Sequence, residues 1–147
     1  MRWFHNGTLA FLEEFGADIG RPVIFKDVTD EPLTIDEALF LDKTDKTLKS
    51  DKQGRGKYMK LLALSVKEAD EIWLRWETEF STGKQVLKRR YIKLFENTDG
   101  SHCLTVFEKG KNGWSGSTTF PAYADRGEEA RKMYVNQYRD GFLAYKK

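Results

Sequence analysis

Four consecutive segments, EIWLRWETEF (71–80), KQVLKRRYIKLFE (84–96), HCLTVFEKG (102–110) and GWSGSTTF (113–120), decide the fold. In the first of them Ile72, Leu74 and Trp76 alternate with the residues between them, which is the period of a strand with one buried face. We therefore expect Trp76 in the core. The turn sequences STGK, NTDG and KNG separate the segments, and Asp-Gly is a strong hairpin signal. Three hairpin turns in succession predict a four-stranded antiparallel meander.

The sequence on either side of this stretch reads mostly as helices that pack on the sheet. Thr34 and Glu37 match a capping box, and Met133 and Tyr138 lie on the apolar side of a closing helix that Gly141 ends. The expected elements are a helix at 8–16, a strand at 21–26, a short helix at 34–40, a main helix at 55–67, the closing helix at 125–141 and an extra edge strand at 142–145. The predicted fold class is α+β, with the meander packed against helices. We expect one domain over 1–147, with an N-terminal helical and loop segment (1–53) and a core (54–147).

Composition limits the classes of protein to which the chain can belong. Its 147 residues are 39% hydrophobic, which is ordinary for a globular domain. The net charge of +2 is too small to announce a nucleic-acid binder by itself. Cys103 is the one cysteine, so an internal disulfide is excluded and a reducing compartment is expected. The sequence also has no signal-peptide core and no membrane-length apolar run.

Five motifs, taken in order, resemble a known phage domain. They are GRGKY (54–58), EIWLRWE (71–77), KRRYIKLFE (88–96), LTVFEKGKNGWSGSTTF (104–120) and GFLAYKK (141–147). Together they are similar to the domain at the C-terminus of Mu F-like head proteins, which is grouped with the barnase, EndoU, colicin tRNase and RelE nucleases. The resemblance implies helices on a curved antiparallel sheet and a metal-independent endoribonuclease activity without a cofactor. Because members of such a superfamily exchange catalytic residues, it assigns no base or acid here.

The leading hypothesis is thus a phage or prophage toxin-like endoribonuclease domain that cleaves RNA by attack of the 2′-OH. The alternative is a non-catalytic phage head or injection module with the same fold, and a weaker one is an ADP-ribosyltransferase. The expected partners are RNA, tRNA included, and an immunity protein or phage head proteins, with no membrane. The expected location is the host cytoplasm or the virion.

We expect the chemistry on one polar face of the meander. Metal-independent RNA cleavage needs a base, an acid and cations around the phosphate. We expect Arg89 to clamp phosphate, Glu77 or His102 to act as base, and Tyr91 to act as acid or stacking platform, with Lys93 beside them. Glu77 has a second interpretation, a cross-strand ion pair with Arg89 or Lys88.

We expect other residues to bind nucleic acid. Cations next to a helix start and exposed tryptophans are typical of phosphate and base contacts, and strand hydroxyls can donate to phosphate. These candidates are Arg55, Lys57, Arg75, Trp73, Trp114 and Thr118. Thr105 is expected on the same polar face. We expect no metal site, because the sequence has no HxH, HExxH or CxxC pattern.

Overall fold

The computed structural model describes residues 6–40, 59–96, 102–110, 113–121 and 128–147. Their order is α1 (Asn6–Glu14), β1 (Val23–Lys26), β2 (Pro32–Ile35), η1 (Glu37–Phe40), α2 (Met59–Lys67), β3 (Glu71–Thr78), β4 (Gln85–Glu96), β5 (His102–Gly110), β6 (Gly113–Pro121), α3 (Glu128–Asn136) and β7 (Phe142–Lys146). The α+β class is confirmed. In this part of the chain no helix is long and apolar enough to cross a membrane.

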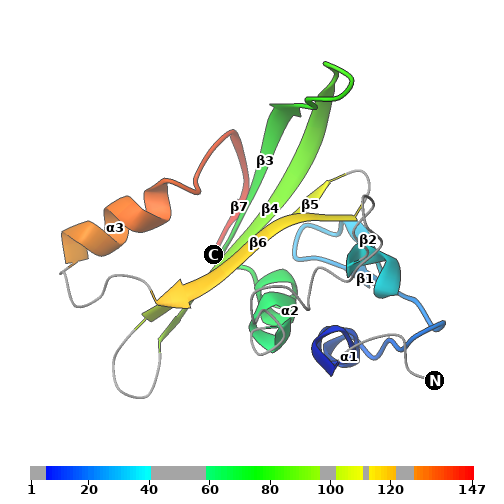
Figure 1. Cartoon of the computed structure of the whole chain (residues 1–147). Coiled ribbons are helices and arrows are strands. Elements are labelled where there is room, and N and C mark those ends of the chain that lie inside the picture. The colour runs from blue at the N-terminus through cyan, green and yellow to red at the C-terminus, as the bar shows by residue number, and fades with distance from the viewer. Residues whose placement is uncertain (1–5, 41–58, 97–101, 111–112, 122–127) are drawn as a thin grey trace.

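The main sheet has five strands in the order β6-β5-β4-β3-β7, and all neighbouring pairs are antiparallel. The predicted meander is therefore present as β3 to β6. The predicted edge strand is also present, because β7 returns from α3 and pairs with β3. A separate hairpin of β1 and β2 lies beside α1 and α2, on one side of the sheet, whereas α3 lies on the other side (Figure 1).

Both faces of the sheet are covered near its middle. On the face called here the α2 face, Ile72, Tyr91 and Phe107 are fully or almost fully buried against α1 and α2. On the opposite α3 face, Ile92 and Val106 pack with Val135 of α3. The prediction of one packed and one open polar face is wrong, because Tyr91 and Thr105, expected on the open face, are buried on the α2 face, and α3 covers the opposite face.

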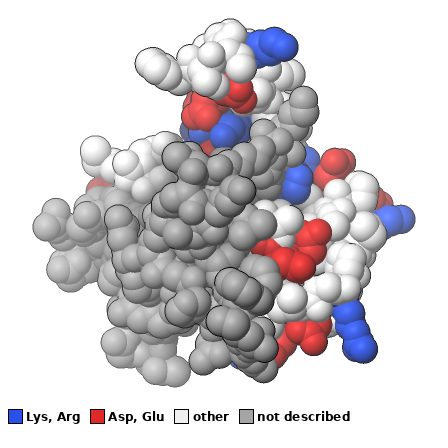
Figure 2. All heavy atoms as spheres, turned by 45° about the vertical axis from the view of Figure 1, so that its right-hand side comes forward, with Lys and Arg blue, Asp and Glu red and all other residues white. Residues whose placement is uncertain are grey.

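The hairpin of β3 and β4 extends past its neighbours. β7 pairs only with residues 71–74 of β3, and β5 begins to pair with β4 at Arg89. Residues 75–78 of β3 and 85–88 of β4 therefore pair with each other and with no other described strand. Figure 2 shows this end standing out from the body, with uncharged side chains over much of it and charged ones of both signs below. Trp76 lies there with 66% of its surface exposed, so its predicted place in the core is wrong.

Gly141 fixes the approach of β7 to β3. Its φ is +93°, and a Cβ at this position would lie 2.2 Å from the carbonyl oxygen of Leu74. Only glycine fits this close approach in the left-handed region. Gly141 therefore serves the start of β7, and the closing helix has already ended at Asn136.

Two predictions about the helices need correction, one on a helix start and one on an apolar face. Thr34 pairs with Ile24 inside β2, and the cap of η1 is Asp36, whose Oδ1 accepts the Ala38 N–H at 3.1 Å. The Glu37 carboxylate accepts from the Gly20 N–H instead of closing a capping box. Among the α3 side chains that the structure describes, Val135 is buried, whereas Met133 is 73% exposed and not part of the core.

Candidate active site

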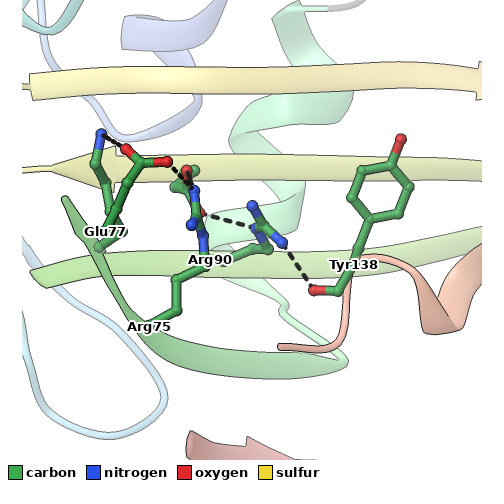
Figure 3. A network of polar contacts seen from close by, with 6 residues as sticks. Arg75, Glu77, Arg90 and Tyr138 are labelled. Atoms are coloured by element: carbon green, nitrogen blue, oxygen red, sulfur yellow. Dashed lines mark hydrogen bonds and ion pairs between the residues drawn. The ribbon is translucent and has the colours of Figure 1, made fainter. Parts of the chain in front are cut away.

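A cluster of five charged side chains occupies the α3 face where the projecting hairpin leaves the body. Cross-strand register places it there, because Arg75 pairs with Lys88 and Arg90 pairs with Glu108. Glu77 lies two residues beyond Arg75 on β3, and therefore on the same face. Figure 3 shows Arg75, Glu77 and Arg90 pointing toward one another from the adjacent strands β3 and β4. We call Arg75, Glu77, Lys88, Arg90 and Glu108 the α3-face cluster.

Glu108 is the buried centre of the cluster. Arg75 binds it with two bonds, Nε to Oε2 at 2.7 Å and an Nη2 bond to Oε1 at 2.8 Å, and Arg90 Nε lies 2.9 Å from Oε2. Burial by itself raises the pKa of Glu108, but the hydrogen bond from Arg75 and the charges of both arginines outweigh it and leave the pKa below its usual value. The bond to Glu108 in turn raises the pKa of Arg75. Glu108 thus stays ionised and fixes both guanidinium groups.

Glu77 is the accessible carboxylate of the cluster. Its Oε1 lies 3.0 Å from Arg75 Nη2 and its Oε2 lies 3.2 Å from Lys88 Nζ, while 43% of its side chain is exposed. Hydrogen bonds from Arg75 and Lys88 hold its pKa below the ordinary value. The predicted ion pair of Glu77 with Lys88 is confirmed. Because the carboxylate is ionised and exposed, it has a free site for a proton and is accessible to a ligand.

The segment after α3 orients Arg90. The Tyr138 carbonyl accepts from Arg90 Nη1 at 3.0 Å, and the Arg90 guanidinium lies over the Tyr138 ring. The next residue, Arg139, is held by Glu71: its Nε donates to Oε1 at 2.8 Å and its Nη2 pairs with Oε2. The α3–β7 connection is thereby tied to the start of β3, and it positions one cation of the cluster.

The predicted site residues do not share one face. Arg89, Tyr91, Lys93 and Thr105 lie on the α2 face, because Arg89 pairs with Leu74 and Lys93 pairs with Thr105. The structure therefore separates them from Arg75 and Glu77, and the proposal of a single active face is wrong. The physical reason is register: Lys88, and not Arg89, stands opposite Arg75.

Tyr91 and Arg89 form a buried network with Asp27, a residue that no sequence pattern singles out. The Tyr91 hydroxyl donates to Asp27 Oδ2 at 2.7 Å, and Arg89 Nε donates to the same oxygen at 2.9 Å. Burial, together with the bond to Asp27, raises the pKa of Tyr91. A fully buried hydroxyl cannot meet a substrate, so the expected roles of Tyr91 as acid or stacking platform have no support in its position.

The remaining candidates are distributed as follows. Lys93 donates to the Glu68 carbonyl at 3.0 Å, which ties it to the end of α2. Trp73 is half-buried on the α3 face, and its Nε1 donates to Glu71. His102 pairs through its backbone with Glu96, and Thr118 with Val106, but the side chains of His102, Trp114 and Thr118 are outside the described part. Arg55 and Lys57 also lie outside the described residues.

Sequence reasoning missed Lys88, Arg90 and Glu108 as parts of the site. A signal for Glu108 was available, since it alternates with Leu104 and Val106 on what reads as a buried face. A carboxylate at such a position is paired in a folded protein. Among the residues that the structure describes, no group of three His, Cys, Asp or Glu side chains forms a candidate metal site.

Comparison with protein families places the chain. A family model described as phage-Barnase-EndoU-ColicinE5/D-RelE like nuclease2 matches residues 10–146, which include every residue of the α3-face cluster. No curated protein and no solved structure matches the chain. The superfamily inferred from the sequence motifs is confirmed, while the link to Mu F-like head proteins stays a prediction. The chain therefore belongs to the phage-Barnase-EndoU-ColicinE5/D-RelE like nuclease2 family.

Proposed function

We propose that the protein is an endoribonuclease that cleaves RNA at the α3-face cluster without a metal ion. One observation carries this proposal: the exposed Glu77 carboxylate lies within 3.2 Å of two cations, Arg75 and Lys88. A base surrounded by fixed cations is the arrangement that attack of a neighbouring hydroxyl on a phosphodiester requires. Family membership supports a nuclease, and the chemistry of the cluster favours RNA because RNA carries its own nucleophile, the 2′-OH.

The proposed reaction begins when Glu77 takes the proton of the ribose 2′-OH. The 2′-oxygen forms a bond to phosphorus, and the bond from phosphorus to the 5′-oxygen breaks. Arg75 and Arg90 are held by Glu108 and stabilise the charge that develops on the phosphate oxygens. Lys88, next to Glu77, gives a proton to the leaving 5′-oxygen. The products are a 2′,3′-cyclic phosphate and a 5′-hydroxyl.

Total RNA, tRNA and a single-stranded oligonucleotide, each incubated with purified protein in EDTA, test this function. Wild type is expected to yield 2′,3′-cyclic ends, and Glu77→Gln is expected to lose on the order of 10²-fold or more of the rate, as removal of a general base does. Glu79→Gln is the matched control, because Glu79 follows β3 on the same hairpin and, within the described part of the chain, its carboxylate accepts only from the Ser81 and Thr82 hydroxyls. Equal losses in both variants would refute the role of Glu77.

A second candidate is a non-catalytic phage module with this fold. It is favoured by the fact that each of the three cations of the cluster is already paired with a carboxylate, as in a purely structural network. RNA that stays intact at high protein concentration, with and without EDTA, would favour this module over the nuclease.

A further inference from the structure

The opposite face of the projecting hairpin has a pocket that the α3-face cluster does not use. It has a volume of about 330 Å³ and lies between the hairpin and the loop that joins β1 to β2. Leu33, Leu74 and Leu87 supply apolar walls, and Arg89, Lys109 and Glu31 supply charged groups. A concave site with apolar walls and a few convergent polar groups is the usual form of a small-ligand site.

The polar groups in the wall have unused hydrogen-bonding capacity. Arg89 is held from behind by Asp27 through Nε and Nη2, at 2.9 and 2.8 Å, which leaves Nη1 without a partner among the described residues. Lys109 stands directly across from Arg89, and its Nζ has only a 3.5 Å contact with the Gly110 carbonyl. Both side chains therefore keep N–H groups that a ligand in the pocket can use.

The balance of charge in the pocket restricts the class of ligand. Asp27 neutralises Arg89, and the Glu31 carboxylate, which has no ion pair within the described part of the chain, offsets Lys109. The pocket wall therefore carries no excess of positive charge that would favour a simple anion as the ligand. It presents donors (Arg89, Lys109) and an acceptor (Glu31) around leucine side chains, which matches a flat group with acceptor and donor atoms on its edge. A nucleobase has this chemistry.

The pocket lies across a free strand edge from the α3-face cluster. Leu87 points into the pocket side and Lys88, the next residue, points to the cluster side, because alternate residues of a strand face opposite ways. No described strand pairs with the side of β4 away from β3 at Leu87 and Lys88, since β5 begins to pair with β4 at Arg89. A single strand of RNA that passes around this edge has the reacting phosphodiester on one face and a neighbouring base on the other.

Trp76 extends the same surface toward the hairpin tip. It pairs with Leu87 across the hairpin, so both side chains lie on the pocket side, and they are 66% and 45% exposed. Exposed aromatic rings next to cations are the usual platforms on which the bases of single strands stack. On this basis, and resting on the proposed nuclease function, we propose that the pocket at Leu74, Leu87, Arg89 and Lys109 is a base-binding subsite for single-stranded RNA.

Calorimetric titration of the Glu77→Gln variant tests the subsite without any need for cleavage. The ligands are the four nucleoside monophosphates, ribose 5-phosphate and inorganic phosphate. Nucleoside monophosphates are expected to bind with dissociation constants on the order of 0.1–1 mM, and the two ligands without a base are expected to bind at least about tenfold more weakly. Equal binding of ribose 5-phosphate and the nucleotides would overturn the proposal, as would no binding at all.

Substitutions locate the bound base. Lys109→Met, made in the Glu77→Gln background, is expected to weaken nucleotide binding on the order of tenfold through loss of a charged donor. Lys84→Met is the matched control, since Lys84 is an exposed cation in the hairpin turn away from the pocket. A melting temperature like that of the parent shows that Lys109→Met is folded. Unchanged affinity in the folded Lys109→Met protein would refute this subsite, whereas a failure of wild type to cleave RNA would refute the nuclease proposal alone.

Discussion

Two charge networks lie on opposite faces of the same strand, β4, and they differ in how far solvent reaches their carboxylates. On the α2 face the side chain of Asp27 is fully buried beneath Arg89 and Tyr91. On the α3 face Glu77 pairs with Arg75 and Lys88 but is 43% exposed. Both networks combine arginine with a carboxylate, so residue type alone does not separate them.

Burial decides what each network can do. Desolvation of Asp27 is offset by hydrogen bonds from Thr29 and Tyr91 and by the charge of Arg89, which together hold its pKa below the ordinary value. Such a closed network stabilises the fold, but its carboxylate cannot reach a substrate. The α3-face cluster has one closed carboxylate, Glu108, that positions cations, and one open carboxylate, Glu77, that is able to accept a proton. Arg89 belongs to both kinds of environment. Its Nε and Nη2 bind the buried Asp27, and the same side chain also lines the pocket beside Leu87.

Asp27→Asn is expected to have the largest effect on the free energy of unfolding. The change removes the charge that compensates Arg89 in a buried site, and breaking a buried pair in this way costs about 3–5 kcal/mol of the free energy of unfolding. Urea denaturation measures the loss. The matched change in the open network, Glu77→Gln, is expected to cost less than about 1 kcal/mol, since exposed pairs contribute little and Arg75 keeps its bonds to Glu108.

A double-mutant cycle shows whether the Asp27 effect comes from the pair. In the Arg89→Met background, Asp27→Asn is expected to lose much less stability, because the uncompensated guanidinium is gone. Similar losses in both backgrounds would mean that Asp27 acts through its bonds to the loop, where its Oδ1 accepts the Thr29 and Glu31 N–H groups.

Tyr91→Phe gives a smaller effect on the same network. The hydroxyl donates to Asp27 at 2.7 Å and accepts from Arg89 Nε at 3.0 Å, so its removal is expected to cost about 1–3 kcal/mol of unfolding free energy. Tyr145→Phe is the control, because Tyr145 packs against the same core and no described residue hydrogen-bonds to its hydroxyl. Equal effects of the two changes would contradict a role for the Tyr91 hydroxyl in closing this network.

The strands could be predicted from the sequence, and so could the faces within each strand. Alternation assigned Ile72 and Leu74 to one side of β3 and Arg75 to the other, and it separated Arg89 from Arg90. How the faces of two strands match depends on the turn between them. The loop at 79–84, closed by the bond from the Glu79 N–H to the Lys84 carbonyl at 2.7 Å, sets that register. Its sequence does not reveal that Arg75 meets Lys88.

The rest of the site depends on contacts between distant parts of the chain. Asp27 meets Tyr91 across 64 positions, and Arg90 meets the Tyr138 carbonyl across 48. Local periodicity has no information on such pairs, because they form only when the β1–β2 loop and the α3–β7 connection dock on the sheet. Trp76 was misplaced for a related reason: alternation identifies a side of the strand, but not where the covering elements end.

The smallest expected effect concerns the pH dependence of cleavage, and it distinguishes Glu77 from His102 as base. Bonds from Arg75 and Lys88 lower the pKa of Glu77 from 4.5, so the carboxylate is ionised throughout the range from about pH 5 to 7. With Glu77 as base, kcat/KM of wild type changes less than about twofold over this range, and it falls only as the pH drops below 4.5.

A histidine base, with a pKa near ~6.5, would give a tenfold or larger decrease between about pH 7 and 5. The contribution of Asp27 to stability does not change over this range, because its pKa is lowered from 3.8 and that contribution is lost only as the pH falls below this ordinary value. Initial rates on one oligonucleotide at constant ionic strength therefore give a direct answer: a flat profile supports Glu77, and a decrease centred near ~6.5 assigns the base to a histidine.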